Sequence, residues 1–256
     1  MVALPGPVHH ARGQRRRGIS VMKISVIVPV VHEGEKINEI LDSIKAASAD
    51  VSYETIVVDG DLSGDTISQI SDSSVITLTA PRGRALQMNA GAARACGDIL
   101  LFLHADTLLP LKAFPKIITA LSNSNFIGGA FDLKIQNRRW IFKAIGLAAS
   151  WKHRLTRVPY GDQAIFILRR YFENMGGYAG IPLMEDVELM KRVKRQRGRI
   201  IILPAAVTTS SRKWETDGVF YAIIRNWIIQ ILYLVGMPAR HLIKYYYKEQ
   251  HHHAGK

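Results

Sequence analysis

The sequence holds a single cysteine, Cys96, and this scarcity narrows the possible architectures. One thiol cannot form an internal disulfide, and it cannot build a cysteine-cluster metal site. Cys96 ends an alanine-rich segment typical of a helix, so we expect a small buried thiol there rather than a nucleophile. A hydrophobic core must then hold the fold together, and 256 residues, 48% of them hydrophobic, suffice for one.

Uninterrupted apolar runs are also missing. A membrane-spanning helix needs about 20 predominantly apolar residues, and the strongly apolar stretch 219–237 is broken by Arg225, Asn226 and Gln230. We therefore expect residues 217–249 to form a helical segment packed on the domain or on a membrane surface. The first 22 residues carry four arginines but lack the apolar core of a secretory signal. We expect a disordered basic leader there and a flexible tail over residues 250–256.

Acidic residues are few: 21 Asp and Glu stand against 34 Lys and Arg, which gives a formal net charge of +13. Such an excess favours an anionic partner, namely nucleotide phosphates, anionic lipid headgroups or nucleic acid. The basic run 191–197 lacks the interleaved aromatic residues that nucleic-acid-binding surfaces use. We therefore expect no nucleic-acid partner. If the protein is not an enzyme, the alternative is a basic nucleic-acid-binding module.

Apolar, β-branched runs alternate with segments of helical periodicity along the first half of the chain. The predicted strands cover residues 23–31, 53–58, 75–79 and 99–103, and the predicted helices lie near residues 37–44, 66–71 and 85–95. This alternation implies crossover connections and a mostly parallel α/β sheet with helices on both faces. The second half is less regular, with strands expected at 126–135 and 164–168 and helices at 140–153 and 185–195. We assign residues 23–216 to one Rossmann-like domain.

Charged residues follow the predicted strands at their carboxyl ends, where open α/β sheets bind their ligands. Asp59 and Asp61 follow the second strand, and a carboxylate there can accept hydrogen bonds from a base or a ribose. Arg82 and Arg84 flank a glycine just before a helix, where side chains and backbone NH groups can meet phosphate oxygens together. Turn formation and helix capping explain part of the acidic loop equally well.

Two further positions are candidates for the chemistry itself. Asp106 follows His104 by two residues at the tip of the fourth strand, where it can hold a Mg²⁺ or Mn²⁺ ion that bridges a diphosphate. Glu185 and Asp186 open a helix; the helix dipole alone favours carboxylates there, and one of them can also serve as a general base. A lone histidine at a strand end is more often structural, so the role of His104 stays open.

Together these segments resemble family 2 glycosyltransferases of the GT-A fold. Ile27–Glu33 is similar to the family's first strand and nucleotide loop, and Asp59–Thr66 to its acidic loop. Leu103–Asp106 stands in place of the DxD metal motif, and Glu185-Asp186 in place of the catalytic pair. A closer resemblance, to a bacterial subgroup named radical-SAM/selenodomain-associated or arsenosugar-related transferases, rests on Gly161-Asp162-Gln163, Gly176-Gly177-Tyr178 to Leu189, and Ser211–Glu215.

The resemblance implies an inverting transfer from a UDP- or GDP-linked sugar to a hydroxyl acceptor. Pro29, Glu33, Asp59 and Asp61 would bind the nucleoside, and Arg82 or Arg84 the diphosphate. Asp106, with His104, would hold Mg²⁺ or Mn²⁺, and Asp186 of the Glu185-Asp186 pair would take the acceptor proton. Arg212 and Trp214 would close over the diphosphate and the acceptor.

This sequence departs from the family pattern at three places. His104 replaces the first Asp of DxD, Gly60 replaces an Asp of the acidic loop, and Ser211–Trp214 is a shortened form of the terminal QxxRW motif. These differences favour a single-transfer enzyme over a processive polymerase. A polyprenyl-phosphate glycosyltransferase is the nearest alternative, and we expect a cytoplasmic protein with peripheral contact to the inner face of the cell membrane.

Overall fold

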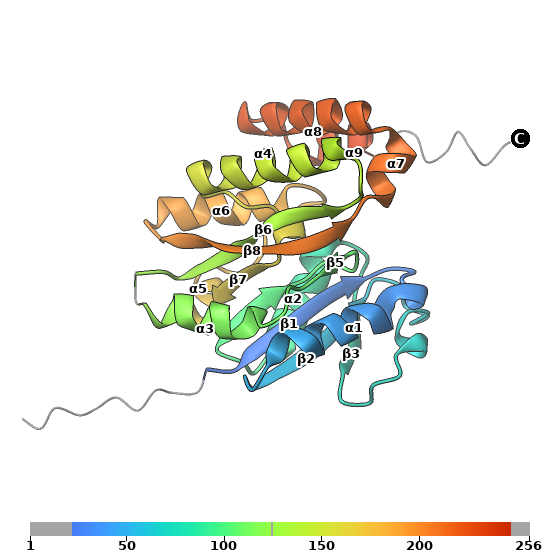
Figure 1. The fold of residues 1–256 in the computed structure, drawn as a ribbon, viewed down its shortest axis with the longest axis vertical. Coiled ribbons are helices and arrows are strands. Elements are labelled where there is room, and N and C mark those ends of the chain that lie inside the picture. Colours follow the sequence, from blue (N-terminus) through green and yellow to red (C-terminus); the bar gives the residue numbers. More distant parts are fainter. Residues whose placement is uncertain (1–21, 124, 247–256) are drawn as a thin grey trace, which may run out of the picture.

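The computed structural model describes residues 22–123 and 125–246 (Figure 1). The predicted leader, apart from Met22, and the predicted tail lie outside the described residues, as do His251 to His253. Eight strands of the described chain form one sheet in the order β3-β2-β1-β4-β7-β6-β8-β5. They are β1 (Ile24–Val30), β2 (Tyr53–Asp59), β3 (Ile76–Thr79), β4 (Ile99–Phe102), β5 (Thr107–Leu108), β6 (Gly128–Gln136), β7 (Ile165–Leu168) and β8 (Ile200–Ser210).

The first four strands are parallel and the rest of the sheet is mixed. β1 pairs in parallel with both β2 and β4, and β2 with β3. β7 runs antiparallel to β4 and β6, β8 is parallel to β6, and β5 is antiparallel to β8. The predicted α/β class is confirmed, with a strand, β6, in the region expected near residues 126–135.

Helices cover both faces of the sheet (Figure 1). One face packs against α1 (Gly34–Ser48) and α3 (Ala113–Ser122), and the other against α2 (Arg84–Arg94), α5 (Arg169–Asn174) and α6 (Glu185–Arg195). The apolar residues of β1 alternate between these two cores, since Val26 and Val28 face the first and Ile27 faces the second. Burial on both faces explains why these strands are almost continuously apolar.

The last helices gather at one end of the molecule, together with α4 (Trp140–Thr156) (Figure 1). They are α7 (Arg212–Asp217), α8 (Val219–Leu234) and α9 (Ala239–Tyr246), and a small separate core joins α8 and α9 to the start of α6. The expected C-terminal helical segment is thus observed over the described residues. Among those residues, no helix combines the length and apolar character needed to cross a membrane.

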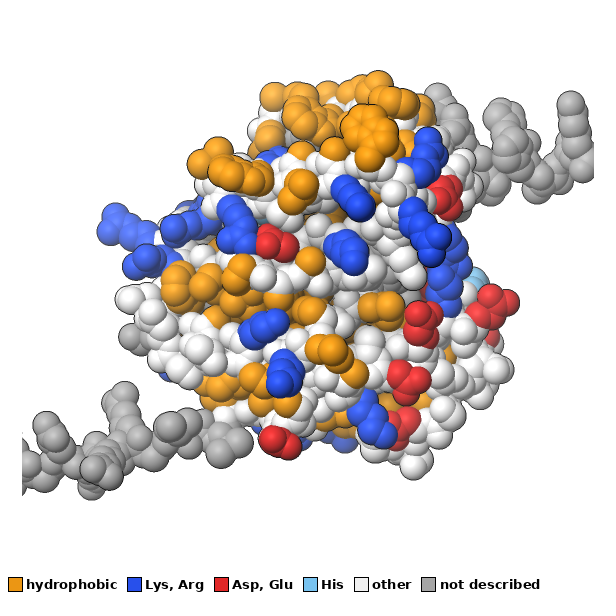
Figure 2. Space-filling model, viewed as in Figure 1, with side chains coloured by type: hydrophobic (Ala, Val, Ile, Leu, Met, Phe, Trp, Pro, Cys, Tyr) orange, Lys and Arg blue, Asp and Glu red, His pale blue; other side chains and the backbone are white. Residues whose placement is uncertain are grey.

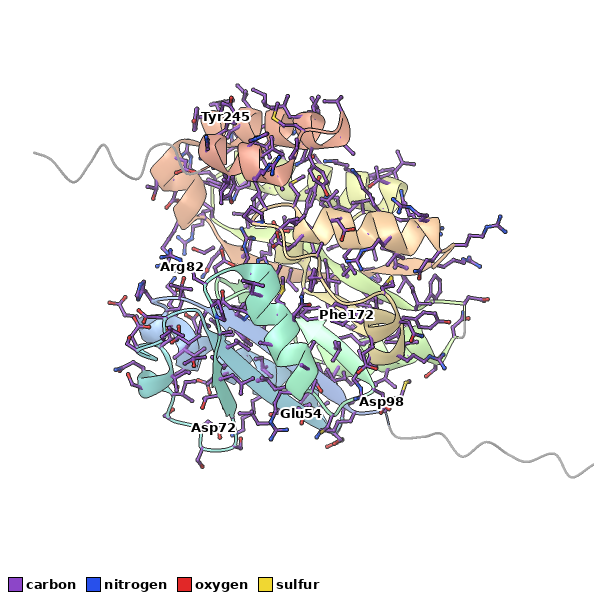
Figure 3. All side chains as sticks on the ribbon, turned by 180° about the vertical axis from the view of Figure 1, so that it is seen from behind. Glu54, Asp72, Arg82, Asp98, Phe172 and Tyr245 are labelled. Atoms are coloured by element: carbon purple, nitrogen blue, oxygen red, sulfur yellow. The ribbon has the colours of Figure 1, made fainter. Side chains whose placement is uncertain are left out.

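Cys96 is exposed, which corrects the expectation of a buried thiol. It lies just past the end of α2 and close to Glu54, and Figure 3 shows Glu54 and Asp98 at the edge of the sheet where the strands begin. The Lys23 ammonium lies 3.0 Å from Cys96 Sγ, and the thiol donates to Glu54 Oε2 at 2.9 Å. The helix ends before its apolar stripe reaches position 96, so the side chain meets polar partners instead of the core.

Candidate active site

A cavity of about 360 Å³ opens at the carboxyl ends of β1 and β4. The short helix η2 (Gly161–Gln163), the first turn of α6, the end of β8 and the C-terminal helices complete its walls. Its lining includes eight residues predicted from the sequence: Pro29, Glu33, Arg84, His104, Asp106, Glu185, Asp186 and Trp214. The topology thus brings together side chains that lie as much as 185 positions apart in the chain, from residue 29 to residue 214.

The Glu185-Asp186 pair sits in the first turn of α6. Asp186 Oδ2 accepts a hydrogen bond from the Gly161 backbone NH at 2.8 Å, and its Oδ1 accepts one from the Val187 NH at 2.7 Å. Glu185 is 4% exposed, and its Oε1 lies 3.7 Å from Nε of Arg84. Burial raises the pKa of both carboxyl groups, while Arg84 opposes the rise. A carboxylate with a raised pKa that is held in a fixed position suits general-base chemistry.

Asp106 and Asp162 add two more carboxylates to the same cavity. Asp106 is exposed within it, and its Oδ1 accepts a hydrogen bond from the Thr107 hydroxyl at 3.1 Å. Asp162 Oδ1 is buried with no hydrogen-bond partner among the described residues. Burial and the neighbouring Asp186 and Asp106 charges raise the pKa of Asp162 to about 7.

The charge balance of the cavity favours a divalent cation. Five carboxylates line the cavity (Glu33, Asp106, Asp162, Glu185 and Asp186), against two arginines there, Arg84 and Arg225. Excess negative charge in a confined space is costly unless a cation offsets it. Carboxylate oxygens are also the ligands that Mg²⁺ and Mn²⁺ prefer. His104 lines the cavity beside Gly161, within reach of the same region.

Asp59 organises the acidic loop instead of lining the cavity. It is 0% exposed, its Oδ1 accepts a hydrogen bond from the Asp61 NH at 2.9 Å, and its Oδ2 accepts one from the Thr66 NH at 3.1 Å. Its carboxylate therefore holds the loop after β2 in shape. Asp59 therefore plays the turn-forming role that the sequence pattern allows as an alternative for this loop.

Asp61 belongs to a second polar cluster, which lies in the loops that follow β1 and β2. His32, Asp61 and Asp65 place one ligand atom each within 4.8 Å of one another. His32 Nδ1 hydrogen-bonds Asp65 Oδ2 at 2.5 Å, which raises the pKa of His32. Neither Asp61 nor Arg82 lines the cavity; Arg82 is exposed on the loop before α2 (Figure 3).

The segment after β8 supplies the remaining wall. Trp214 of α7 lines the cavity, and Arg212 Nη2 lies 3.7 Å from Glu33 Oε2. Arg212 itself is outside the lining but bridges α7 to the loop after β1. This contact joins the segment after β8 to the segment after β1 beside the cavity.

Several lining residues were not predicted from the sequence. Tyr160 caps η2 and Asp162 lies within it, and Ala222, Arg225, Asn226, Ile229 and Gln230 come from α8. Arg225 keeps only 9% of its side chain exposed, and its Nη2 pairs with Asp217 Oδ2 at 2.6 Å. The sequence did contain a signal for Arg225, because a charged residue in an otherwise apolar helix needs a polar surrounding. The cavity provides that surrounding.

The glycosyl transferase family 2 model matches residues 25–181, which is more than half of the chain. The chain belongs to this family. The matched region contains Pro29, Glu33 and Asp106 and ends just before Glu185-Asp186. The narrower resemblance to the radical-SAM/arsenosugar subgroup is not part of this finding.

Curated relatives are partial matches. A dolichol-phosphate mannosyltransferase from Pyrococcus furiosus is 32% identical over 112 residues, covering 41% of this chain and 32% of the relative. The probable glycosyltransferase YdaM from Bacillus subtilis is 27% identical over 220 residues, covering 76% of this chain and 51% of the relative. The chain thus spans about a third to a half of the length of these relatives.

Solved structures support the fold. The mannosyltransferase PcManGT from Pyrobaculum calidifontis, in complex with GDP-Man and Mn²⁺, superposes with a TM-score of 0.54 at 21% identity, over 72% of this chain and 56% of that one. S. aureus TarS superposes with a TM-score of 0.58 at 18% identity, over 82% and 66%. At these identities the likeness concerns the fold, and it agrees with the predicted GT-A architecture.

Proposed function

We propose that the protein is an inverting glycosyltransferase that moves a sugar from a UDP- or GDP-linked donor to a hydroxyl acceptor. The observation that carries this proposal is the position of Asp186, which faces the same cavity as Asp106 and Arg84. A base, a candidate cation ligand and a fixed positive charge within one cavity are the groups that such a transfer requires. The family assignment and the Mn²⁺ complex of PcManGT support the same reaction type.

The donor would lie over the carboxyl ends of β1 and β4. Pro29 and Glu33 line the nucleoside side, Arg84 reaches the diphosphate, and Asp59 and Asp61 shape the neighbouring loop. Asp106 and His104 would hold Mg²⁺ or Mn²⁺, which offsets the negative charge on the departing diphosphate. Arg82 and Arg212 stand outside the lining, where they can approach the phosphates as Trp214 closes the cavity.

Asp186 would accept the proton of the acceptor hydroxyl. The oxygen then attacks the anomeric carbon while the bond to the diphosphate breaks, and the diphosphate leaves with both electrons. A single displacement inverts the anomeric centre and needs no covalent sugar–enzyme intermediate. The hydrogen bonds from Gly161 and Val187 orient this carboxylate, and Glu185 holds Arg84 near the phosphates.

The named relatives favour a second acceptor class. They include a dolichol-phosphate mannosyltransferase and undecaprenyl-phosphate 4-deoxy-4-formamido-L-arabinose transferases. A polyprenyl phosphate is already anionic and needs no base, so the two acceptor classes predict different effects for Asp186→Asn. The location and the subgroup are further parts of the proposal. We propose that the protein is cytoplasmic with peripheral membrane contact. Within the family, we propose that it belongs to the radical-SAM/arsenosugar subgroup, because of its Gly161–Gln163 and Ser211–Glu215 segments.

Isothermal calorimetry with UDP and GDP, each with and without Mn²⁺, tests the donor site. We expect one nucleotide to bind in a Mn²⁺-dependent manner, with loss of this binding in Asp106→Ala and its retention in Asp186→Asn. The rate of transfer to a hydroxyl acceptor should then fall by about 10²–10⁴-fold in Asp186→Asn. Absence of binding to both nucleotides under all conditions would contradict the proposed reaction.

A further inference from the structure

Helices α4 and α8 lie against each other at the end of the molecule that carries the C-terminal helices (Figure 1). The Lys152 ammonium of α4 donates to Gln230 Oε1 of α8 at 2.7 Å, and it lies 5.8 Å from the centroid of the Trp227 ring. These contacts hold the two helices side by side and leave one side of each facing solvent. We call the solvent-facing side chains of α4 and α8 the outer face.

The outer face is strongly apolar. Most of the exposed large hydrophobic residues of the described chain belong to these two helices, and side chains of this kind gather over α8 in Figure 2. The most exposed are Trp140 (77%), Leu147 (66%), Trp151 (75%), Leu155 (86%), Phe220 (73%), Trp227 (61%) and Leu234 (64%). Such a concentration of exposed apolar side chains on two adjacent helices marks a docking site, whereas scattered exposed residues would need no explanation.

The charge on the two helices and their flanking residues has a single sign. Residues 138–157 and 218–246 contain no Asp or Glu. They do contain exposed basic residues, among them Arg138, Arg139, Lys143, Arg240 and Lys244. Arg154 of α4 is already paired, because its Nη2 lies 2.6 Å from Asp132 Oδ2 of β6. Tryptophan and tyrosine next to lysine and arginine are typical of surfaces that lie at the headgroup level of a bilayer. An apolar protein partner would not select for this one-sided charge, but anionic lipid headgroups do.

We propose that the outer face docks the protein in the plane of an anionic lipid bilayer. The apolar side chains of α4 and α8 would enter the boundary between headgroups and acyl chains, and the basic residues would pair with the headgroups. Exposed Tyr245 of α9 adds an aromatic residue at the same end (Figure 3). Docking requires no spanning helix, which agrees with the lengths of the described helices.

Docking also places the cavity at the membrane. The opposite side of α8 lines the cavity through Ala222, Arg225 and Ile229, so one helix separates the proposed bilayer contact from the site. A lipid-borne acceptor could then present its polar head to the cavity while its tail stays among the acyl chains. This consequence rests on the proposed function, whereas the docking itself does not.

Flotation of the purified full chain on vesicles tests the docking. Vesicles of phosphatidylglycerol mixed into phosphatidylcholine should carry the protein upward, and vesicles of phosphatidylcholine alone should carry less, with the difference lost at high salt. Leu234→Glu on α8 and Leu155→Glu on α4 should each weaken binding by about tenfold or more. Leu111→Glu is the matched control, because Leu111 is 72% exposed but lies before α3, away from the outer face.

The outcomes separate the alternatives. Equal flotation of the Leu234→Glu, Leu155→Glu and Leu111→Glu variants, or no flotation of the unmodified chain, overturns the proposal. A dimer in sedimentation that Leu234→Glu dissociates, without flotation, would show that a second copy covers the face instead. Nucleotide binding by the Leu234→Glu variant must be unchanged. If the chain floats but binds no nucleotide, the docking stands and the proposed transferase is refuted. If the chain binds a nucleotide but does not float, the docking is refuted and the proposed transferase stands.

Discussion

Gly161 lies between the proposed base, Asp186, and the proposed metal ligand, His104, so a single added methyl group tests both roles. A Cβ at this position would sit 2.6 Å from Cε1 and Nε2 of His104 and 3.7 Å from Oδ2 of Asp186. Ordinary van der Waals contact begins at 3.4 Å, so the imidazole must move by about 3.4 − 2.6 = 0.8 Å. A misplacement near 1 Å at a reacting centre costs about 10²-fold in rate. We therefore expect Gly161→Ala to lower kcat by about 10²-fold.

The fold should survive this change. Overpacking one methyl group costs about 1–3 kcal/mol, which for a domain of this size lowers Tm by about 2–10 °C. The assay is the initial rate of nucleoside diphosphate release from the donor identified by calorimetry, measured below both melting transitions. Gly180→Ala is the control, because a Cβ there meets nothing within 4 Å. A Gly161→Ala variant as active as Gly180→Ala would refute the assigned roles of His104 and Asp186.

Three further predictions concern groups outside the cavity lining. Burial lowers the pKa of His153 from 6.5 to about 4, so only the unfolded chain takes up this proton between those values. Stability should fall by up to about 3 kcal/mol as the pH drops from about 6.5 to 4, and His153→Phe should flatten this slope in urea titrations at both pH values. Gly129→Ala should cost about 1–3 kcal/mol in the same titrations, because its Cβ would press on the Ile201 carbonyl; an unchanged midpoint contradicts the tight β6–β8 pairing. The hydrogen bond to Asp65 raises the pKa of His32, so the pKa of His32 measured by NMR titration should fall toward its ordinary value in Asp65→Asn. The same pKa in both proteins would mean that the pair does not form in solution.

Local patterns were sufficient for the elements that carry their own signal. The apolar runs at β1, β2 and β4 were predicted within one or two residues, and α6 was predicted at its observed bounds, Glu185–Arg195. Each of these segments is buried along its full length or along one clear stripe, so sequence periodicity reflects the packing directly. The order of the motifs along these strands also indicated the position of the candidate site.

What escaped prediction depends on contacts between distant segments. β8 contains Pro204 and pairs with β6 across a register shift, so its pattern does not resemble a regular strand. Arg225 reads as an interruption of an apolar helix until the fold turns it toward the cavity. Asp59 shows a role that its position did not reveal, since its buried carboxylate accepts hydrogen bonds from two backbone NH groups of the loop after β2.

The cavity takes its first wall from Pro29 and its last from Tyr246, and this has a consequence for biosynthesis. Every strand of the described sheet is translated before α8 and α9. A nascent chain can thus begin to collapse around its sheet while the cavity still lacks one side. A product terminated after β8 would keep all the strands of the described fold but would lack the wall of the cavity that α8 and α9 supply.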